Sequence, residues 1–200
     1  MKKIRISIVL LAGWIMLLLC GAAAETQTIP SIRDTVDSAV KPFSFRNGVL
    51  WGMDSAQVQS TESIQMDERS SGEWSVMVSS EPVEVSRFTA DLIYMFRDNA
   101  LQMIAYEFQT CTTLNYQYLT GALSAVYGES QTADATRIKA YMDLLYPDRY
   151  RTDWITHMYV WHAEDGTCVF MYYYSSEAYA ILYVNPQLMN NVNGYAVNGL

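Results

Sequence analysis

Apolar and polar residues alternate between residues 63 and 109, which is the pattern of half-buried β-strands. The clearest strand has five apolar side chains on one face, namely Phe88, Ala90, Leu92, Tyr94 and Phe96. Residues 97–100 predict a turn, and the segment from Leu101 to Gln109 returns with a second apolar face formed by Ile104, Tyr106 and Phe108. The alternation therefore predicts an antiparallel hairpin.

The spacing becomes helical in three places. A short helix is expected to begin at Asp54, whose carboxylate and the side chain of Gln57 fit a capping box. A second helix starts near Asn115 and ends at Gly128, with an inward stripe of Tyr116, Leu119, Leu123, Val126 and Tyr127. A third helix is predicted over 133–145, closed by Pro147.

Three further strands are predicted over 154–162, 168–174 and 178–184. Strands and helices in this order favour an α+β fold: a two-layer sandwich with an antiparallel sheet, helices packed on one face and the other face bare. The two halves of the chain suggest two loose repeats of helix plus strands. We expect a linker over 25–42, a single α+β domain over 43–185 and a loose polar tail over 186–200.

The first 24 residues have the three-part layout of a secretory signal peptide. Lys2, Lys3 and Arg5 precede an apolar run over 6–19, and three alanines ending at Ala24 offer a cleavage site. The run is shorter than the about 20 residues that span a bilayer, so no membrane span is expected in the mature chain. We expect an extracytoplasmic protein, secreted or in the cell envelope. A lipid anchor at Cys20 is the less favoured alternative, because bulky Leu19 precedes it.

Net charge narrows the class of partner. The full chain carries a charge of −8, and removing the three basic residues of the leader lowers it to −11. Such a chain repels nucleic acid and anionic lipid, which leaves another protein as the expected partner.

Two cysteines remain after the leader, Cys111 and Cys168. In an oxidising compartment they either pair as a disulfide or stay as two buried free thiols. Both alternatives remain open at this point.

No cofactor, metal site or catalytic motif is predicted. Ser38 and Lys41 have the spacing of acyl-serine enzymes but lack the accompanying elements. His157 and His162 are five residues apart, which places them on opposite faces of one strand. Scattered carboxylates such as Glu107 or Glu164 do not by themselves define a hydrolase.

Aromatic residues are abundant in the last three strands. With helices on one side only, some of these side chains are expected to face solvent, where Tyr and Trp suit protein interfaces and sugar stacking. Ordinary cross-strand packing is the alternative. The predicted interaction surface consists of Tyr159, Trp161, Tyr173, Tyr179 and Tyr183.

The segment Trp51-Gly52-Met53, with the helix start that follows it to Val58, resembles the opening of small exported α/β modules. These are the beta-lactamase inhibitor protein-like and small outer-membrane assembly lipoprotein-like modules. Together with Tyr127-Gly128-Glu129, the segment is similar to an uncharacterised exported bacterial family that has a proline where this chain has Ser130. The resemblance implies a sandwich whose open sheet face binds a partner, and it carries over no functional residues.

The sequence therefore favours an exported, non-enzymatic binding protein of the bacterial envelope or secretome. Its rivals are an envelope hydrolase acting on cell-wall or other glycans and a structural spacer domain.

Overall fold

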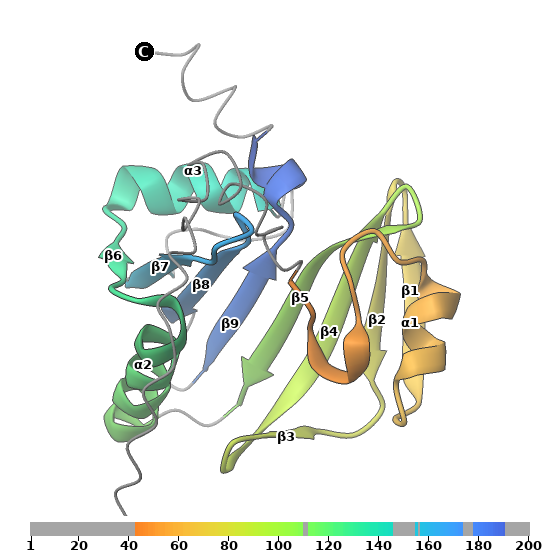
Figure 1. The fold of residues 1–200 in the computed structure, drawn as a ribbon, viewed down its shortest axis with the longest axis horizontal. Helices are drawn as coiled ribbons and strands as arrows, with labels where there is room; N and C mark the ends of the chain where they lie inside the picture. The colour runs from red at the N-terminus through yellow and green to blue at the C-terminus, as the bar shows by residue number, and fades with distance from the viewer. Residues whose placement is uncertain (1–42, 110–111, 146–154, 156, 174–177, 191–200) are drawn as a thin grey trace, which may run out of the picture. The chain divides into compact units, whose positions relative to one another are not determined.

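The computed structural model describes residues 43–109, 112–145, 155, 157–173 and 178–190, all within one unit of contacts over residues 39–200. The elements in chain order are η2 (Arg46–Gly48), α1 (Ser55–Thr61), β1 (Met66–Ser71), β2 (Trp74–Ser79), β3 (Val83–Val85), β4 (Phe88–Arg97), β5 (Ala100–Phe108), α2 (Thr113–Tyr127), β6 (Gln131–Thr132), α3 (Ala135–Leu145), β7 (Met158–His162), β8 (Cys168–Tyr173) and β9 (Tyr179–Val184). Figure 1 shows their arrangement.

The strands form one antiparallel sheet in the order β1-β2-β4-β5-β9-β8-β7-β6, with β3 paired to β4. The predicted α+β class and antiparallel sheet are confirmed. Each half of the chain consists of a helix followed by antiparallel strands, and the last strands of the two halves, β5 and β9, pair with each other. This topology is consistent with the expected loose repeat, in which β6 and α3 are an insertion in the second half.

The helix ends follow the local chemistry that the sequence predicts. The Asp54 carboxylate accepts a hydrogen bond from the Gln57 backbone N–H at 2.8 Å, and the Gln57 side chain accepts one from the Asp54 N–H at 3.0 Å. This is the expected capping box of α1. Gly128 follows α2 at φ 83°, a conformation that glycine adopts without a Cβ penalty and that ends the helix.

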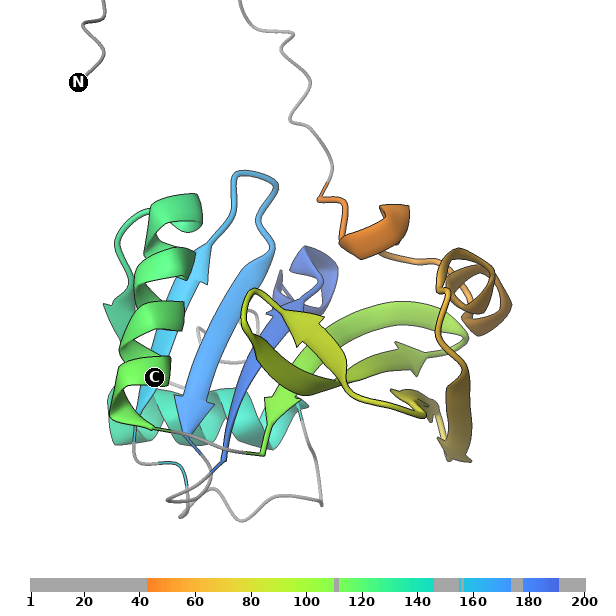
Figure 2. The ribbon, with the colours of Figure 1, turned by 90° about the horizontal axis from the view of Figure 1, so that it is seen from below.

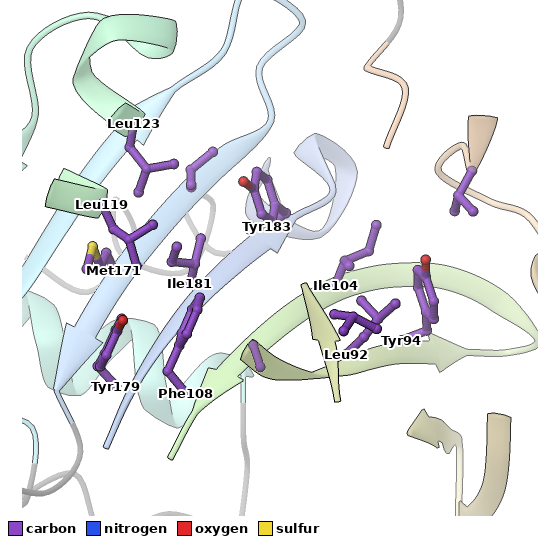
Figure 3. Close-up of a cluster of buried hydrophobic side chains, with 14 of the residues drawn as sticks. Leu92, Tyr94, Ile104, Phe108, Leu119, Leu123, Met171, Tyr179, Ile181 and Tyr183 are labelled. Carbon is purple, nitrogen blue, oxygen red and sulfur yellow. The ribbon is translucent and has the colours of Figure 1, made fainter. Parts of the chain in front are cut away.

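The helices lie on both faces of the sheet, so the expectation of helices on one face and a bare opposite face is wrong for β7–β9. Leu119 and Leu123 of α2 pack in a first core with Met171 and Ile181, on the face shared with α1 (Figure 3). Ile138 and Met142 of α3 pack in a second core on the other face, with Phe170, Tyr172 and Leu182. Figure 2 shows the blue strands β7–β9 between the green α2 and the teal α3.

The segment before α1 is anchored to the sheet by a buried polar network. The Glu62 side chain, which is 0% exposed, pairs with Arg46 Nε at 3.4 Å. The same carboxylate accepts hydrogen bonds from the Tyr94 hydroxyl at 2.5 Å and from Asn47 Nδ2 at 3.2 Å. Because Tyr94 lies on β4, the network joins the start and end of the α1 region to the middle of the sheet.

A second anchor joins this segment to the β7–β8 turn. Trp51 Nε1 donates to Thr167 Oγ1 at 3.0 Å, and the Phe43 backbone N–H donates to the Asp165 carboxylate at 3.0 Å. The rings of Phe43 and Trp51 stack at 5.6 Å, and Phe43 also lies 5.6 Å from the ring of Tyr183. The segment therefore covers part of the first core.

The C-terminal boundary differs from the prediction. Residues 186–190, assigned from the sequence to a loose tail, form a helical turn whose Leu188 and Met189 are buried in the second core. The turn begins at Asn185, whose carbonyl accepts hydrogen bonds from the Leu188 and Met189 N–H groups at 3.0 and 3.2 Å, and it directs the two apolar side chains into the core. The predicted leader and linker, and residues 191–200, lie outside the described residues. No described helix has both the length and the apolar character needed to cross a membrane.

Candidate interaction surface

The five predicted surface aromatics do lie on one sheet face, but α2 and the 43–53 segment cover that face. Trp161 and Tyr179 are 0% exposed and Tyr183 is 8% exposed, while Tyr159 and Tyr173 are half-buried. Trp161 Nε1 donates a hydrogen bond to Ser124 Oγ of α2 at 3.2 Å. The predicted interaction surface is therefore wrong for the three buried residues.

These aromatic rings hold α2 on the sheet instead. Tyr116 of α2 stacks on Tyr173 at 4.1 Å between ring centroids, and it also lies 5.9 Å from Tyr159 and 6.0 Å from Tyr179. Tyr179 in turn stacks on Phe108 at 4.5 Å. Aromatic pairs of this kind contribute about 0.5–1.5 kcal/mol each beyond their buried area. The cluster therefore explains the aromatic richness of β7–β9 as packing.

Of the four large apolar side chains that the described residues expose, three belong to α2, and the fourth is Leu50. Leu114 is 74% exposed, Tyr118 43% and Val126 72%. We call the side of α2 opposite the first core the outer face of α2, and it consists of Leu114, Gln117, Tyr118, Gly121, Ala122 and Ala125, all exposed. The 15 residues of α2 include no charged side chain. An exposed helix face that has no charge and carries a leucine and a tyrosine marks a contact surface.

Val126 was predicted to face inward with Tyr116 and Leu123, and this assignment is wrong. At about 100° per residue, Val126 lies about 20° from buried Leu119. The valine stands in the last turn of α2, where it is 72% exposed, and it is not part of the outer face.

The turn between β3 and β4 borders the outer face and adds a positive charge. The guanidinium carbon of Arg87 lies 4.2 Å from the centre of the Tyr118 ring and 5.3 Å from that of Phe88. Phe88 contacts Tyr118 edge to face at 5.7 Å, and Ser86 Oγ lies 3.2 Å from the Tyr118 hydroxyl. Arg87 is exposed and forms no ion pair with another residue that the structure describes.

A hollow of about 410 Å³ lies at the C-terminal end of α2, lined by Ser124, Gly128, Glu129 and Ser130. Its side chains are two hydroxyls and one carboxylate, which can form hydrogen bonds to a bound group. Glu129 is exposed and follows the helix directly, so it places a negative charge at the opposite end of α2 from Arg87.

The structure does not bring together the two carboxylates named for a hydrolase. Glu107 lies near the end of β5, level with Ala180 of β9, whereas Glu164 is exposed in the β7–β8 turn. Glu107 is instead the register partner of Asp91 on β4. Burial, and then the charge of Asp91, raise the pKa of Glu107. Sequence reasoning missed this pair, although it had identified the hairpin that carries both residues.

Cys168 is a buried free thiol, as in the second of the two alternatives for the cysteines, and Cys111 lies outside the described residues. The Sγ atom of Cys168 lies 3.3 Å from His162 Nδ1. Burial raises the pKa of the thiol to about 11, which keeps it protonated and unreactive at neutral pH. His157 is exposed and does not join this pair. Among the described residues, no group of three His, Cys, Asp or Glu side chains is placed to hold a metal ion.

Comparisons of the chain with protein families, with curated proteins and with solved structures found no match. The resemblance that begins at Trp51-Gly52-Met53 therefore stays a prediction, and the outer face of α2, bordered by Arg87 and Glu129, is the surface on which a functional proposal depends.

Proposed function

We propose that the chain is an exported, non-enzymatic interaction protein of the bacterial envelope or secretome. It binds another protein through the outer face of α2 and the adjoining Arg87 and Phe88. The observation that carries the proposal is the pair of exposed side chains Leu114 and Tyr118, one turn apart on a helix without charges.

The energetics of this surface favour binding. Burying apolar surface contributes about 25 cal/mol per Å², so covering a leucine and a tyrosine supplies a few kcal/mol before the costs of association. Tyr and Arg are also the residue types in which binding energy concentrates at interfaces. Tyr118 is already held by Phe88, Ser86 and Arg87, so a partner gains its contacts with little loss of side-chain freedom.

The proposed location rests on the leader. Export of the chain, with removal of the leader near Ala24, places the outer face of α2 outside the cytoplasm, in the secretome or at the envelope. The net charge of −11 after removal of the leader supports a protein as the partner rather than nucleic acid.

Site-specific crosslinking tests the proposal. A photoreactive residue at position 114, in the outer face, is compared with the same residue at Ala140, an exposed position of α3. The protein is exported by its own host and illuminated in culture. We expect a discrete protein adduct from position 114 and none from position 140. Equal adducts from both positions, or none from either, would contradict the proposal.

One observation favours a second candidate, a hydrolase acting on glycans. A carboxyl of raised pKa beside a second carboxylate is the pairing used in glycoside hydrolysis, and Glu107 and Asp91 form such a pair. An activity screen of the exported protein against cell-wall glycans decides the question. Activity lost in both Glu107→Gln and Asp91→Asn would support this candidate over the first.

A further inference from the structure

The outer face of α2 has the spacing of a helix-pairing seam. Leu114, Tyr118, Gly121 and Ala125 follow one another at intervals of four, three and four residues. This is the spacing of the a and d positions in paired helices. The same helix already uses Tyr116, Leu119 and Leu123 for the first core. The outer spacing is therefore a second apolar stripe, separate from the one that folding uses.

Gly121 lies in the middle of this seam without a reason inside the chain. A glycine within a helix is unfavourable because it loses the most backbone freedom on folding. Gly121 is exposed, its φ is not positive, and no described atom lies within 4 Å of the Cβ that another residue would add. With Ala122 and Ala125 beside it, the position leaves room for a second helix to approach closely.

The charges at the ends of the seam show which helix matches it. Arg87 lies over Tyr118 in the first half of α2, and Glu129 follows its last turn. If a copy of α2 lies antiparallel and centred between Gly121 and Ala122, Tyr118 faces Ala125 of the copy. Glu129 of the copy, which directly follows the Gly128 cap, then lies near the first turn of α2, toward the end at which Arg87 stands. The two-fold arrangement makes this pairing twice.

We propose that the occupant of the outer face of α2 is a second copy of this chain, packed antiparallel through Leu114, Tyr118, Gly121 and Ala125. The inference rests on the proposed function and names its partner. Elsewhere the net charge of −11 that remains after removal of the leader makes copies repel each other. The seam itself carries no charge, so two copies can pack there without repulsion. The residues that flank it, Arg87 and Glu129, have opposite charges and attract each other across the pair.

The small area predicts a weak dimer. A single helix face with one adjoining turn covers less than the about 800 Å² per partner of stable complexes. We therefore expect half-association at roughly 10–100 µM, so the dimer forms where the exported chain is concentrated.

Sedimentation equilibrium tests the proposal with the exported chain, purified without its leader, from about 1 to 500 µM. The parent is expected to shift from monomer to dimer over this range. Ala125→Glu places two carboxylates in the seam and should leave a monomer throughout. Ala140→Glu makes the same change on α3 and should associate like the parent. Circular dichroism verifies that both variants keep their helices.

Charge exchange tests the antiparallel register. Arg87→Glu and Glu129→Arg should each weaken association about tenfold, and the variant with both changes should regain the affinity of the parent. A monomeric parent at every concentration, association unchanged by Ala125→Glu, or no recovery in the double exchange would each overturn the inference. If the parent is monomeric but position 114 crosslinks to a different protein, the proposed function stands without the dimer. If position 114 gives no adduct either, both fail.

Discussion

Removing one hydroxyl, by Tyr94→Phe, should destabilise the fold by about 2 kcal/mol. The Tyr94 hydroxyl donates to the buried carboxylate of Glu62, whose side chain is 0% exposed. A hydrogen bond to a charged group contributes about 1.5–3 kcal/mol, and phenylalanine keeps the ring volume. The variant leaves Glu62 with only Asn47 and Arg46 as partners. Urea unfolding at pH 7 gives the change in the free energy of unfolding.

Tyr118→Phe is the matched control, because it removes a hydroxyl whose contact with Ser86 is exposed. Its effect should stay below about 0.5 kcal/mol. A double-mutant cycle of Tyr94→Phe with Glu62→Gln should give a coupling of at least about 1 kcal/mol. The reasoning is refuted if Tyr94→Phe and Tyr118→Phe destabilise equally, or if Tyr94→Phe changes stability by less than about 0.5 kcal/mol.

Four further predictions concern the two cores and their titrating groups. The raised pKa of Glu107 means that the folded chain loses stability as pH rises through that pKa. Glu107→Gln should therefore be more stable than the parent at pH 7, and this difference should vanish below the pKa that glutamate has in the unfolded chain. Urea unfolding that finds the variant less stable than the parent at pH 7 would contradict the raised pKa. Burial raises the pKa of five tyrosines above about 10, the pKa of tyrosine in the unfolded chain; they are Tyr94, Tyr106, Tyr127, Tyr141 and Tyr183. The free energy of unfolding should therefore fall as pH rises above about 10, and phenolate absorbance should rise over the same range. In a Cys111→Ser background, the Cys168 thiol should resist alkylation at pH 8 until urea unfolds the chain; rapid labelling of the native protein would exclude its burial. Leu119→Ala should destabilise by about 2–5 kcal/mol in the same urea assay, because it opens a cavity between α2 and the sheet; a loss below about 1 kcal/mol would mean that α2 is not a core helix.

Local signals in the sequence predict most of the elements. The capping residues of α1, the Gly128 end of α2 and the β4–β5 hairpin all agree with the structure. Each of these depends on residues close together in the chain, whose chemistry restricts the backbone directly. Asp98 and Asn99 adopt φ 52° and 59°, as short polar residues in a tight hairpin turn do.

The Asp91–Glu107 pair depends on a bulge that the sequence does not reveal. Arg97 pairs with Ala100 and Phe96 with Leu101, but Met95 pairs with Met103, so one residue of β5 is extra. Without this shift Glu107 would lie opposite Ala90 rather than Asp91. A slip of one residue exchanges the two faces of a strand. The Asp91–Glu107 pair can therefore be identified only when the register of β4 and β5 is known.

The sequence analysis did not predict that α3 covers the second face of the sheet, although the sequence contains a pattern that indicates it. In β8 and β9 the runs 168–173 and 179–184 are apolar at every position, and all but one of these side chains are buried. Continuous apolar strands indicate a sheet covered on both faces. That pattern argues against a bare face, and with it against a solvent-exposed row of tyrosines.

The two faces of α2 have different surroundings, and the sequence predicts only the inner one. The first core takes Tyr116, Leu119 and Leu123, as the helical spacing predicts, whereas Leu114 and Ala125 contribute little to it, since both are exposed. Periodicity alone does not say whether the outer stripe is covered by another part of the chain. Because the two stripes share no residue, stability and association should respond to different substitutions. Substitutions in the inner stripe should alter the free energy of unfolding, and substitutions in the outer stripe should alter only the concentration at which the chain dimerises.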